Sequence, residues 1–301
     1  MLNLIYMKKL PKSQSGQTLL LVLLSMAVIL TIVLSILSRS ITDITITSKE
    51  EEALRAFSAA EAGIEKALLS GIFAPGTFEG SSFSGSISNL AESQAALTYP
   101  EELVSGDSAT IWFIDHDPTT GELTCSTGNC FAGSSMKVCW GKEGTAAGTS
   151  TTPAMEISIL YDSTPSPSGN YSDVKIKRLA LDPNSGRTGT NKFSSASGIC
   201  TISGNSFAFS TNVNFTGSGL NIPCYSTAGC LLNAKLRMLY NTSAQSVGVE
   251  VTGDTLPSQG VMVESTGVAG EATRKVEVFQ TFGELPPVFD SAIFSPGGLV
   301  K

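Results

Sequence analysis

Charged side chains are scarce in this 301-residue chain, where Asp, Glu, Lys and Arg together make up 15% of the residues. Glycine is abundant at 29 residues, and serine and threonine are common. Such a composition favours a β-rich, exported protein over a cytosolic enzyme. The net charge of −7 provides no excess of positive charge, so no nucleic-acid partner is expected. The length allows one or two domains with a hydrophobic core.

Motifs of common enzymes and metal sites are also missing. The sequence has no glycine-rich phosphate loop and a single histidine, His116. With Asp115 or Asp117 it has the residue types of a Ser-His-Asp set, but it follows a predicted strand at a turn, where a lone histidine is common. The oxygens of Asp115, Asp117, Thr119 and Glu122 are of the type that Ca²⁺ prefers, yet the loop lacks the glycine of an EF-hand. We therefore expect a solvated turn, with no enzymatic activity and no cofactor.

Zinc-binding cysteine pairs are absent as well. The six cysteines all lie in the last two thirds of the chain, at Cys125, Cys130, Cys139, Cys200, Cys224 and Cys230. Zinc sites favour C-x2-C pairs, whereas the close spacings here are C-x4-C and C-x5-C. An even number of cysteines in an exported chain predicts disulfides, and fifteen pairings remain open.

No acidic residue precedes Asp43, and residues 19–37 carry no charge at all. Their only polar side chains are Ser25, Thr31 and Ser35. About 20 apolar residues span a bilayer as a helix, whereas a cleavable signal peptide has a core of about 7–15. No small-residue cleavage site of the A-x-A type follows. The run therefore predicts a retained membrane span over residues 18–38.

Three of the 19 basic residues, Lys8, Lys9 and Lys12, lie ahead of this run. The chain from Gln17 onward then has 16 basic against 26 acidic side chains, a net charge of −10. A basic start before an apolar run keeps the N-terminus in the cytoplasm. The part after the run is therefore expected outside the membrane.

The helix is expected to continue beyond the membrane. Residues 39–69 contain no proline, and Phe57, Ala60, Ile64 and Leu68 form a stripe at helical spacing. Residues 41–47 are rich in β-branched side chains, which are poor helix formers, so we expect a weak point there. The pattern predicts one helix over residues 17–69, with an apolar first half and an amphipathic second half.

The start of this helix resembles the processing site of type IV prepilins and pseudopilins, which have a short basic leader, a glycine and a long apolar helix. The resemblance implies that residues 1–16 are a leader and that a prepilin peptidase cuts between Gly16 and Gln17. It also implies N-methylation of Gln17. Thr18 matches the usual second mature residue. Met7 would be an alternative start that leaves a leader of typical length.

A second motif lies about forty residues further on, in the sequence AFSAAEAGIEKAL. It resembles the signature A-A-E-A/S-G-I-E-x-A-L of PilX-type minor pilins, through Ala60, Glu61, Gly63, Ile64 and Glu65. Glu61 and Glu65 lie four residues apart, and we expect them to provide helix polarity and contacts with a neighbouring subunit. Residues 264–282 and 285–300 resemble, more thinly, the closing strand and tail of PilX-like proteins.

Leu21 departs from the pilin pattern. Most major pilins have glutamate at this fifth mature position, where it neutralises the N-terminal amine of a neighbouring subunit. A carboxylate among apolar helices costs several kcal/mol unless it is paired. Without that group, the resemblance implies a minor subunit.

After residue 70 the spacing of apolar side chains changes from that of a helix to that of strands. Eight segments have the composition or alternation of strands. They are residues 109–115, 135–141, 154–162, 173–182, 206–215, 233–240, 246–253 and 274–282. Trp112 and Trp140 lie within them and are expected in the core. The fold class is α+β, with residues 70–108 (and 76–88 in particular) as a linker or loop and 109–301 as an antiparallel β domain covered by the amphipathic half of the helix.

The combined interpretation is a structural minor subunit of a type IV pilus or related pseudopilus. Its implied partners are other pilin subunits, the prepilin peptidase and the inner-membrane assembly platform. Its implied locations are the inner membrane, as a single-pass precursor, and then the surface fibre. Two alternatives remain: a single-pass anchored adhesin or binding module that never enters a fibre, and a membrane-tethered hydrolase that uses His116.

Overall fold

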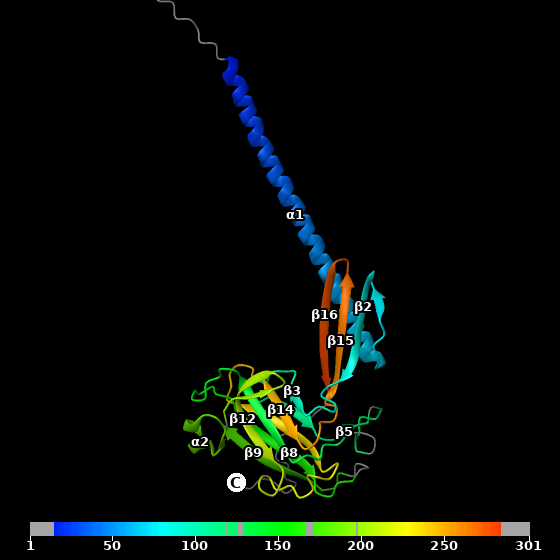
Figure 1. The fold of residues 1–301 in the computed structure, drawn as a ribbon, viewed down its shortest axis with the longest axis vertical. Coiled ribbons are helices and arrows are strands. Elements are labelled where there is room, and N and C mark those ends of the chain that lie inside the picture. Colours follow the sequence, from blue (N-terminus) through cyan, green and yellow to red (C-terminus); the bar gives the residue numbers. More distant parts are fainter. Residues whose placement is uncertain are drawn as a thin grey trace, which may run out of the picture. The chain divides into compact units, whose positions relative to one another are not determined.

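The computed structural model describes residues 15–117, 119–125, 129–166, 171, 173–196 and 198–283. It has a long N-terminal helix followed by antiparallel β-sheets, which confirms the α+β prediction (Figure 1). The chain forms two compact units. One holds the described residues up to Gly85 together with Ser265–Val276, and the other holds Ser86–Glu264 with the described residues from Glu277 onward.

Helix α1 spans Ser15–Ser70, close to the predicted bounds. It passes through residues 41–47 without a break, so the expected weak point is wrong. The hydroxyls of Thr42, Thr45 and Thr47 each donate to the backbone carbonyl four residues earlier, at 2.9–3.0 Å. Threonine hydroxyls that bond back to the helix in this way need no solvent or partner for their polar groups.

A four-stranded sheet has the order β1-β2-β15-β16. Its strands are β1 (Gly76–Phe78), β2 (Ser81–Asn89), β15 (Gly260–Ala269) and β16 (Ala272–Thr281). The expectation of a linker or loop over residues 76–88 is therefore wrong. Ser81 and Phe83 are buried while their neighbours are exposed, and the turn at Glu79 and Gly80 has positive φ at both positions. That is the pattern of a tight hairpin, which the serine-rich composition concealed.

Two five-stranded sheets lie within the second unit, in the orders β10-β9-β8-β13-β4 and β11-β12-β7-β14-β3. The first contains β4 (Ser108–Trp112), β8 (Ala154–Asp162), β9 (Val174–Asp182), β10 (Ser194–Ser195) and β13 (Leu231–Leu239). The second contains β3 (Ala96–Thr98), β7 (Ser135–Lys142), β11 (Cys200–Ile202), β12 (Asn205–Asn214) and β14 (Val247–Thr252). All eight predicted strands are present. The strands that the sequence did not predict are β2, β15 and the short ones, including the small pair β5 (Asp115–His116) and β6 (Leu123–Thr124).

These two sheets pack on each other and share one hydrophobic core. Trp140 is fully buried in it, and its indole N–H donates to the carbonyl of Pro153 at 3.0 Å. Trp112 is only partly buried and points away from this core, so the expectation that both tryptophans are core residues is wrong for Trp112. The expected role of α1 is also corrected. The five-stranded sheets cover each other, and the amphipathic half of α1 covers the four-stranded sheet.

The cysteines pair as Cys125–Cys130, Cys139–Cys200 and Cys224–Cys230, and none is free. The disulfide prediction is confirmed. Two of the bonds join residues five and six positions apart and close small loops. Cys139–Cys200 joins β7 to β11 across 61 positions, a pairing that depends on the sheet bringing the two strands together.

A short helix, α2 (Ser185–Asn191), follows β9 and is held by an ion pair. The Asp182 side chain is fully buried, and its carboxylate accepts two hydrogen bonds from the Arg187 guanidinium, at 2.8 and 2.9 Å. The same guanidinium donates to the backbone carbonyls of Ser150 and Thr152, at 2.8 and 2.7 Å. Burial raises the pKa of the Asp182 carboxyl, but the hydrogen bonds and charge of Arg187, with bonds from Asn184 and Asn191, bring that pKa below its usual value.

Candidate functional site

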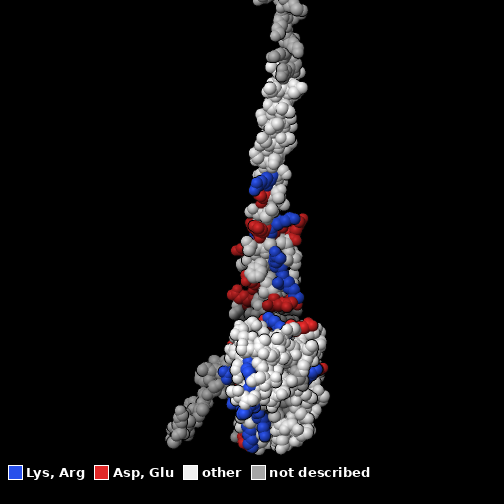
Figure 2. All heavy atoms as spheres, turned by 90° about the vertical axis from the view of Figure 1, so that its left-hand side faces the viewer, with Lys and Arg blue, Asp and Glu red and all other residues white. Residues whose placement is uncertain are grey.

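The first half of α1 is an uncharged, apolar surface. From Leu19 to Leu37 every large apolar side chain is exposed, by 46–68%. The hydroxyls of Ser25 and Thr31 donate to carbonyls three residues earlier, at 2.9 and 2.8 Å, so these polar groups are satisfied within the helix. Figure 2 shows this stretch of α1 without a charged side chain.

Nineteen helical residues at about 1.5 Å each extend about 28 Å, close to the hydrocarbon thickness of a bilayer. Among the described residues, this is the one helix long and apolar enough to cross a membrane. A helix also satisfies its own backbone hydrogen bonds, as a segment in lipid must. The first half of α1 therefore has the length and composition of a membrane anchor.

The predicted processing residues lie at the beginning of this helix. Gly16 and Gln17 are in α1 by their backbone, and Thr18 and Leu21 are exposed on it. The leader expected over residues 1–16 lies outside the described residues except for its last two. Cleavage and methylation at Gly16 and Gln17 stay predictions.

The second half of α1 lies on the four-stranded sheet through small residues. The buried face consists of Ala56, Ala59, Ala60, Gly63, Ile64 and Ala67. The predicted stripe is right for Ala60 and Ile64 and wrong for Phe57 and Leu68, which are 43% and 41% exposed. Large side chains were expected to face the sheet, but the helix approaches too closely for them.

Two glycines show how close this approach is. A Cβ on Gly267 of β15 would lie 1.9 Å from the carbonyl oxygen of Ala56, and one on Gly63 of α1 would lie 2.4 Å from the hydroxyl oxygen of Ser265. Real Cβ atoms do not occupy such positions, so a side chain at Gly267 would have to displace the backbone of α1, and one at Gly63 would have to displace the Ser265 hydroxyl. Sequence reasoning missed Ser265 and Gly267. Their signal is an alternate-residue series of small side chains in β15, ending at Ala269.

The motif residues divide between the two sides of α1. Ala60, Gly63 and Ile64 are buried against the sheet, while Glu61 and Glu65 are exposed. The motif is therefore a structural pattern, with small residues for close packing and charges for the solvent side. Contacts of Glu61 and Glu65 with a neighbouring subunit stay a prediction.

Glu52 holds the far end of the β15–β16 hairpin. Its carboxylate accepts the backbone N–H of Glu271 at 3.2 Å. Gly270, the preceding residue, has φ +55°, and a Cβ there would lie 2.5 Å from the Glu52 carboxyl carbon. The hairpin turn is thus fitted to a side chain of α1.

The loop with the single histidine is a turn packed on aromatic rings. Asp117 accepts the backbone N–H groups of Thr119 and Thr120, both at 2.8 Å, and these bonds lower the pKa of its carboxyl. This arrangement agrees with the solvated-turn interpretation. Within the described residues no group of three or more His, Cys, Asp or Glu side chains could hold a metal ion, so Asp115, Asp117 and Glu122 form no such site.

His116 stacks on Phe282, with ring centroids 3.7 Å apart, and meets the edge of Trp112 at 4.6 Å. Burial lowers the pKa of its imidazole to about 4. Its Nδ1 is buried without a hydrogen-bond partner among the described residues, so no described carboxylate holds the ring through that nitrogen. The contacts of His116 are those of a packed aromatic side chain.

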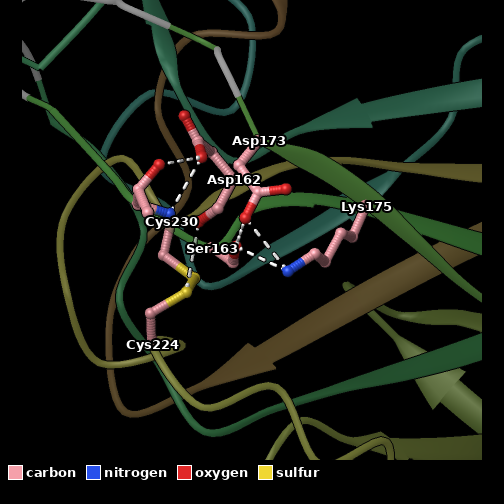
Figure 3. Close-up of a disulfide and its surroundings, with 7 residues drawn as sticks. Asp162, Ser163, Asp173, Lys175, Cys224 and Cys230 are labelled. Carbon is pink, nitrogen blue, oxygen red and sulfur yellow. Dashed lines mark hydrogen bonds and ion pairs between the residues drawn. A yellow bond between two sulfur atoms is a disulfide. The ribbon is translucent and has the colours of Figure 1, made fainter.

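A polar cluster lies beside the Cys224–Cys230 disulfide (Figure 3). The Lys175 ammonium donates to the Ser163 hydroxyl at 2.9 Å and is 3.0 Å from the Asp173 carboxylate, which also accepts from Ser163. Serine–lysine pairs act as nucleophile and base when the lysine is desolvated and neutral. Lys175 is half exposed and ion-paired, so this cluster has no free base.

No model of a protein family, no curated protein and no solved structure matches this chain significantly. The resemblance to pilins therefore stays a prediction that rests on the two sequence motifs in α1. Those motifs occupy the uncharged half of the helix and the half packed on the sheet.

Proposed function

We propose that this protein is a minor structural subunit of a type IV pilus or a related pseudopilus. One observation carries the proposal: an exposed, uncharged helix about as long as a bilayer is thick continues without a break into a half that packs on a sheet. One rod of this kind can occupy lipid first and a bundle of similar helices later. The resemblance of both halves to pilin motifs supports the assignment.

The physical logic is that the first half of α1 needs an apolar partner at every stage. Transfer of one large aliphatic side chain out of water is worth about 1.5–3 kcal/mol. Lipid provides this environment before assembly, and the helices of neighbouring subunits provide it in a fibre. The second half of α1 stays on its own sheet, held by Gly267 and Glu52.

Leu21 favours a minor over a major subunit. Before Asp43 the chain has no carboxylate that could pair with the N-terminal amine of a neighbouring subunit. Around Leu21 such a subunit packs against its neighbours through apolar contacts alone, which suits a component present in few copies.

The alternative is a single-pass anchored binding module whose helix never leaves the membrane. The same apolar surface favours it, because a permanent anchor requires the same length and composition. The two functions differ at one bond, since only a fibre subunit is expected to be cut between Gly16 and Gln17.

N-terminal sequencing and intact-mass measurement of the mature protein, with and without a functional prepilin peptidase, test the proposal. We expect a methylated Gln17 start with the peptidase and an uncut leader without it. Gly16→Leu should block cutting, whereas Ser13→Leu, three residues upstream, should not. A mature N-terminus at Met1 or Met7 in cells with an active peptidase would contradict the proposal.

Fractionation of surface fibres distinguishes the proposed fibre subunit from the anchored binding module. Sheared surface fibres should contain the processed chain in small amounts relative to the main subunit. Recovery of processed protein only from the membrane fraction would support the anchored module instead.

A further inference from the structure

A stretch of α1 lies beyond the predicted membrane span and before the helix reaches its sheet. The span ends near residue 38, and Glu52 meets the tip of the β15–β16 hairpin. Residues 39–48, about 15 Å of helix, are exposed throughout. Ile41 and Ile44 are 65% and 67% exposed in this stretch. Single exposed aliphatic side chains are ordinary, but the spacing of these two along the helix is not.

Ile41 and Ile44 continue a series of apolar side chains at alternating spacings of three and four residues. Such spacings are those of positions a and d in a heptad repeat, the positions that meet in a coiled coil. We call the series the heptad seam, and its members are Leu20, Leu23, Ala27, Leu30, Leu34, Leu37, Ile41 and Ile44. All of them are exposed in the single chain. The eight polar side chains between residues 20 and 44 all lie off the seam, at Ser25, Thr31, Ser35, Ser38, Arg39, Ser40, Thr42 and Asp43.

The charges of this stretch point away from the seam. Arg39 and Asp43 occupy the outward positions f and c of the heptad. The flanking positions e and g beyond the span carry only hydroxyl side chains, those of Ser38, Ser40, Thr45 and Thr47. Two identical helices can therefore meet along the seam without repulsion between like charges.

The seam ends where α1 approaches its own sheet. Glu51 and Arg55 take later d and a positions, and they form an ion pair with each other. Glu52, next to them, accepts the backbone N–H of the hairpin residue Glu271. The apolar seam thus covers the part of α1 that has no cover from its own chain among the described residues.

We propose that α1 packs in parallel on a second copy of this chain along the heptad seam. Copies in one membrane share their orientation, because the basic residues ahead of the apolar run keep every N-terminus on the same side. The same apolar run also sets the same depth in each copy. Two seams therefore meet in register. Such pairing requires the membrane anchor alone, without cleavage after Gly16 or entry into a fibre.

Ile41 and Ile44 contribute most to this pairing. Within the span the leucines exchange lipid tails for a partner helix, which provides no hydrophobic driving force. The two isoleucines lie beyond the span, so pairing removes their side chains from water. Pairing also supports the helix itself, because residues 41–47 are rich in poor helix formers and depend on packing for helical stability.

Disulfide cross-linking in native membranes tests the seam. The six native cysteines are all paired, so an engineered cysteine is the single free thiol. Ile44→Cys should form a disulfide-linked dimer, because the d positions of two parallel helices face each other. Ile46→Cys is the matched control, since Ile46 is 51% exposed but occupies position f.

The control position cannot form the same bond within a seam-paired dimer. Two f positions lie more than one helix diameter apart, about 10 Å, whereas a disulfide requires Cβ atoms about 4 Å apart. Dimer formation by Ile44→Cys but not by Ile46→Cys is the expected result. Equal yields at the two positions, or no dimer at Ile44→Cys, would overturn the proposal.

Two differently tagged copies in one cell identify the partner. The product cross-linked at Ile44→Cys should contain both tags. A product that joins one tagged chain to a different protein would assign the seam to that protein and refute pairing between copies.

Sedimentation equilibrium in density-matched detergent measures the association without a cross-link. The wild-type chain should have at least twice the monomer mass. Ile44→Asp should reduce it to the monomer mass, because two carboxylates would face each other on the seam. Ile46→Asp should leave it unchanged, and Trp140 fluorescence checks that both variants keep a folded sheet domain. A monomeric wild type, or the same mass for all three proteins, would contradict the pairing.

Discussion

Gly267 of β15 lies directly against the carbonyl oxygen of Ala56 in α1, so closely that a Cβ on the glycine would be 1.9 Å from that oxygen. The helix and the sheet meet backbone to backbone at this point. Such contact excludes water and leaves no room for a methyl group.

Gly267→Ala should therefore weaken the packing of α1 on its sheet. We expect a loss of about 1–3 kcal/mol in the free energy of unfolding, because overpacking forces the helix away from β15. Urea unfolding in detergent, combined with limited proteolysis of the second half of α1, measures both effects. Val268→Ala is the matched control, since Val268 is 39% exposed on the other side of the strand. Equal stability of the two variants would refute the close contact.

Arg187→Ala should destabilise the sandwich by about 3–5 kcal/mol, because it leaves the fully buried Asp182 carboxylate without its charged partner. Arg187→Lys should also be destabilising, since lysine cannot reproduce the two parallel bonds to Asp182. Unfolding followed by Trp140 fluorescence reports the loss. The exposed pair Lys142–Glu102 is the control, and Lys142→Ala should change stability by no more than about 1 kcal/mol. Similar effects at both sites would contradict this difference.

His116 should titrate far below an ordinary histidine. Its pKa is about 4 in the folded chain, whereas an unperturbed histidine titrates near 6.5. The unfolded chain thus binds the proton more tightly, so His116 favours folding above pH about 6.5, and this contribution is lost as the pH falls toward about 4. NMR of the single imidazole gives the midpoint without ambiguity. Phe282→Ala should raise it toward 6.5, and a wild-type midpoint near 6.5 would disprove the burial.

The three disulfides should differ in their effect on stability. In the loop-closure view, removing Cys139–Cys200, which spans 61 positions, costs about 4 kcal/mol, and removing Cys224–Cys230, which spans six, costs about 2 kcal/mol. Paired cysteine-to-alanine variants and urea unfolding give the comparison. The reverse order would show that local packing outweighs chain entropy at these bonds.

Sequence patterns predicted the longest elements well. The bounds of α1 followed from an apolar run and from the absence of proline up to residue 69, and the eight strands followed from composition or alternation. The hairpin β1–β2 was missed because its serines and glycines resemble a linker, although Phe83 is buried in it. Composition describes average solvation, whereas burial at Phe83 depends on its packing beside Gly63 of α1.

The candidate site, too, was predicted from the sequence only in part. Residues 19–37 could be recognised as an anchor because the run carries no charge and only three polar side chains, whatever surrounds it. The buried face of the second half of α1 was placed one position wrong at Phe57, since spacing alone cannot reveal how closely a sheet approaches. The partner glycine, Gly267, lies more than two hundred residues away.

The amino-acid sequence by itself thus determined the uncharged helix, the strand-rich domain and the presence of disulfides, because these depend on local hydropathy, periodicity and cysteine number. Only the tertiary structure decided which cysteines pair, which face of α1 is buried and that the two large sheets cover each other. Each of these depends on contacts between segments distant in the chain, and such contacts are selected by the packing of the whole rather than by any local pattern.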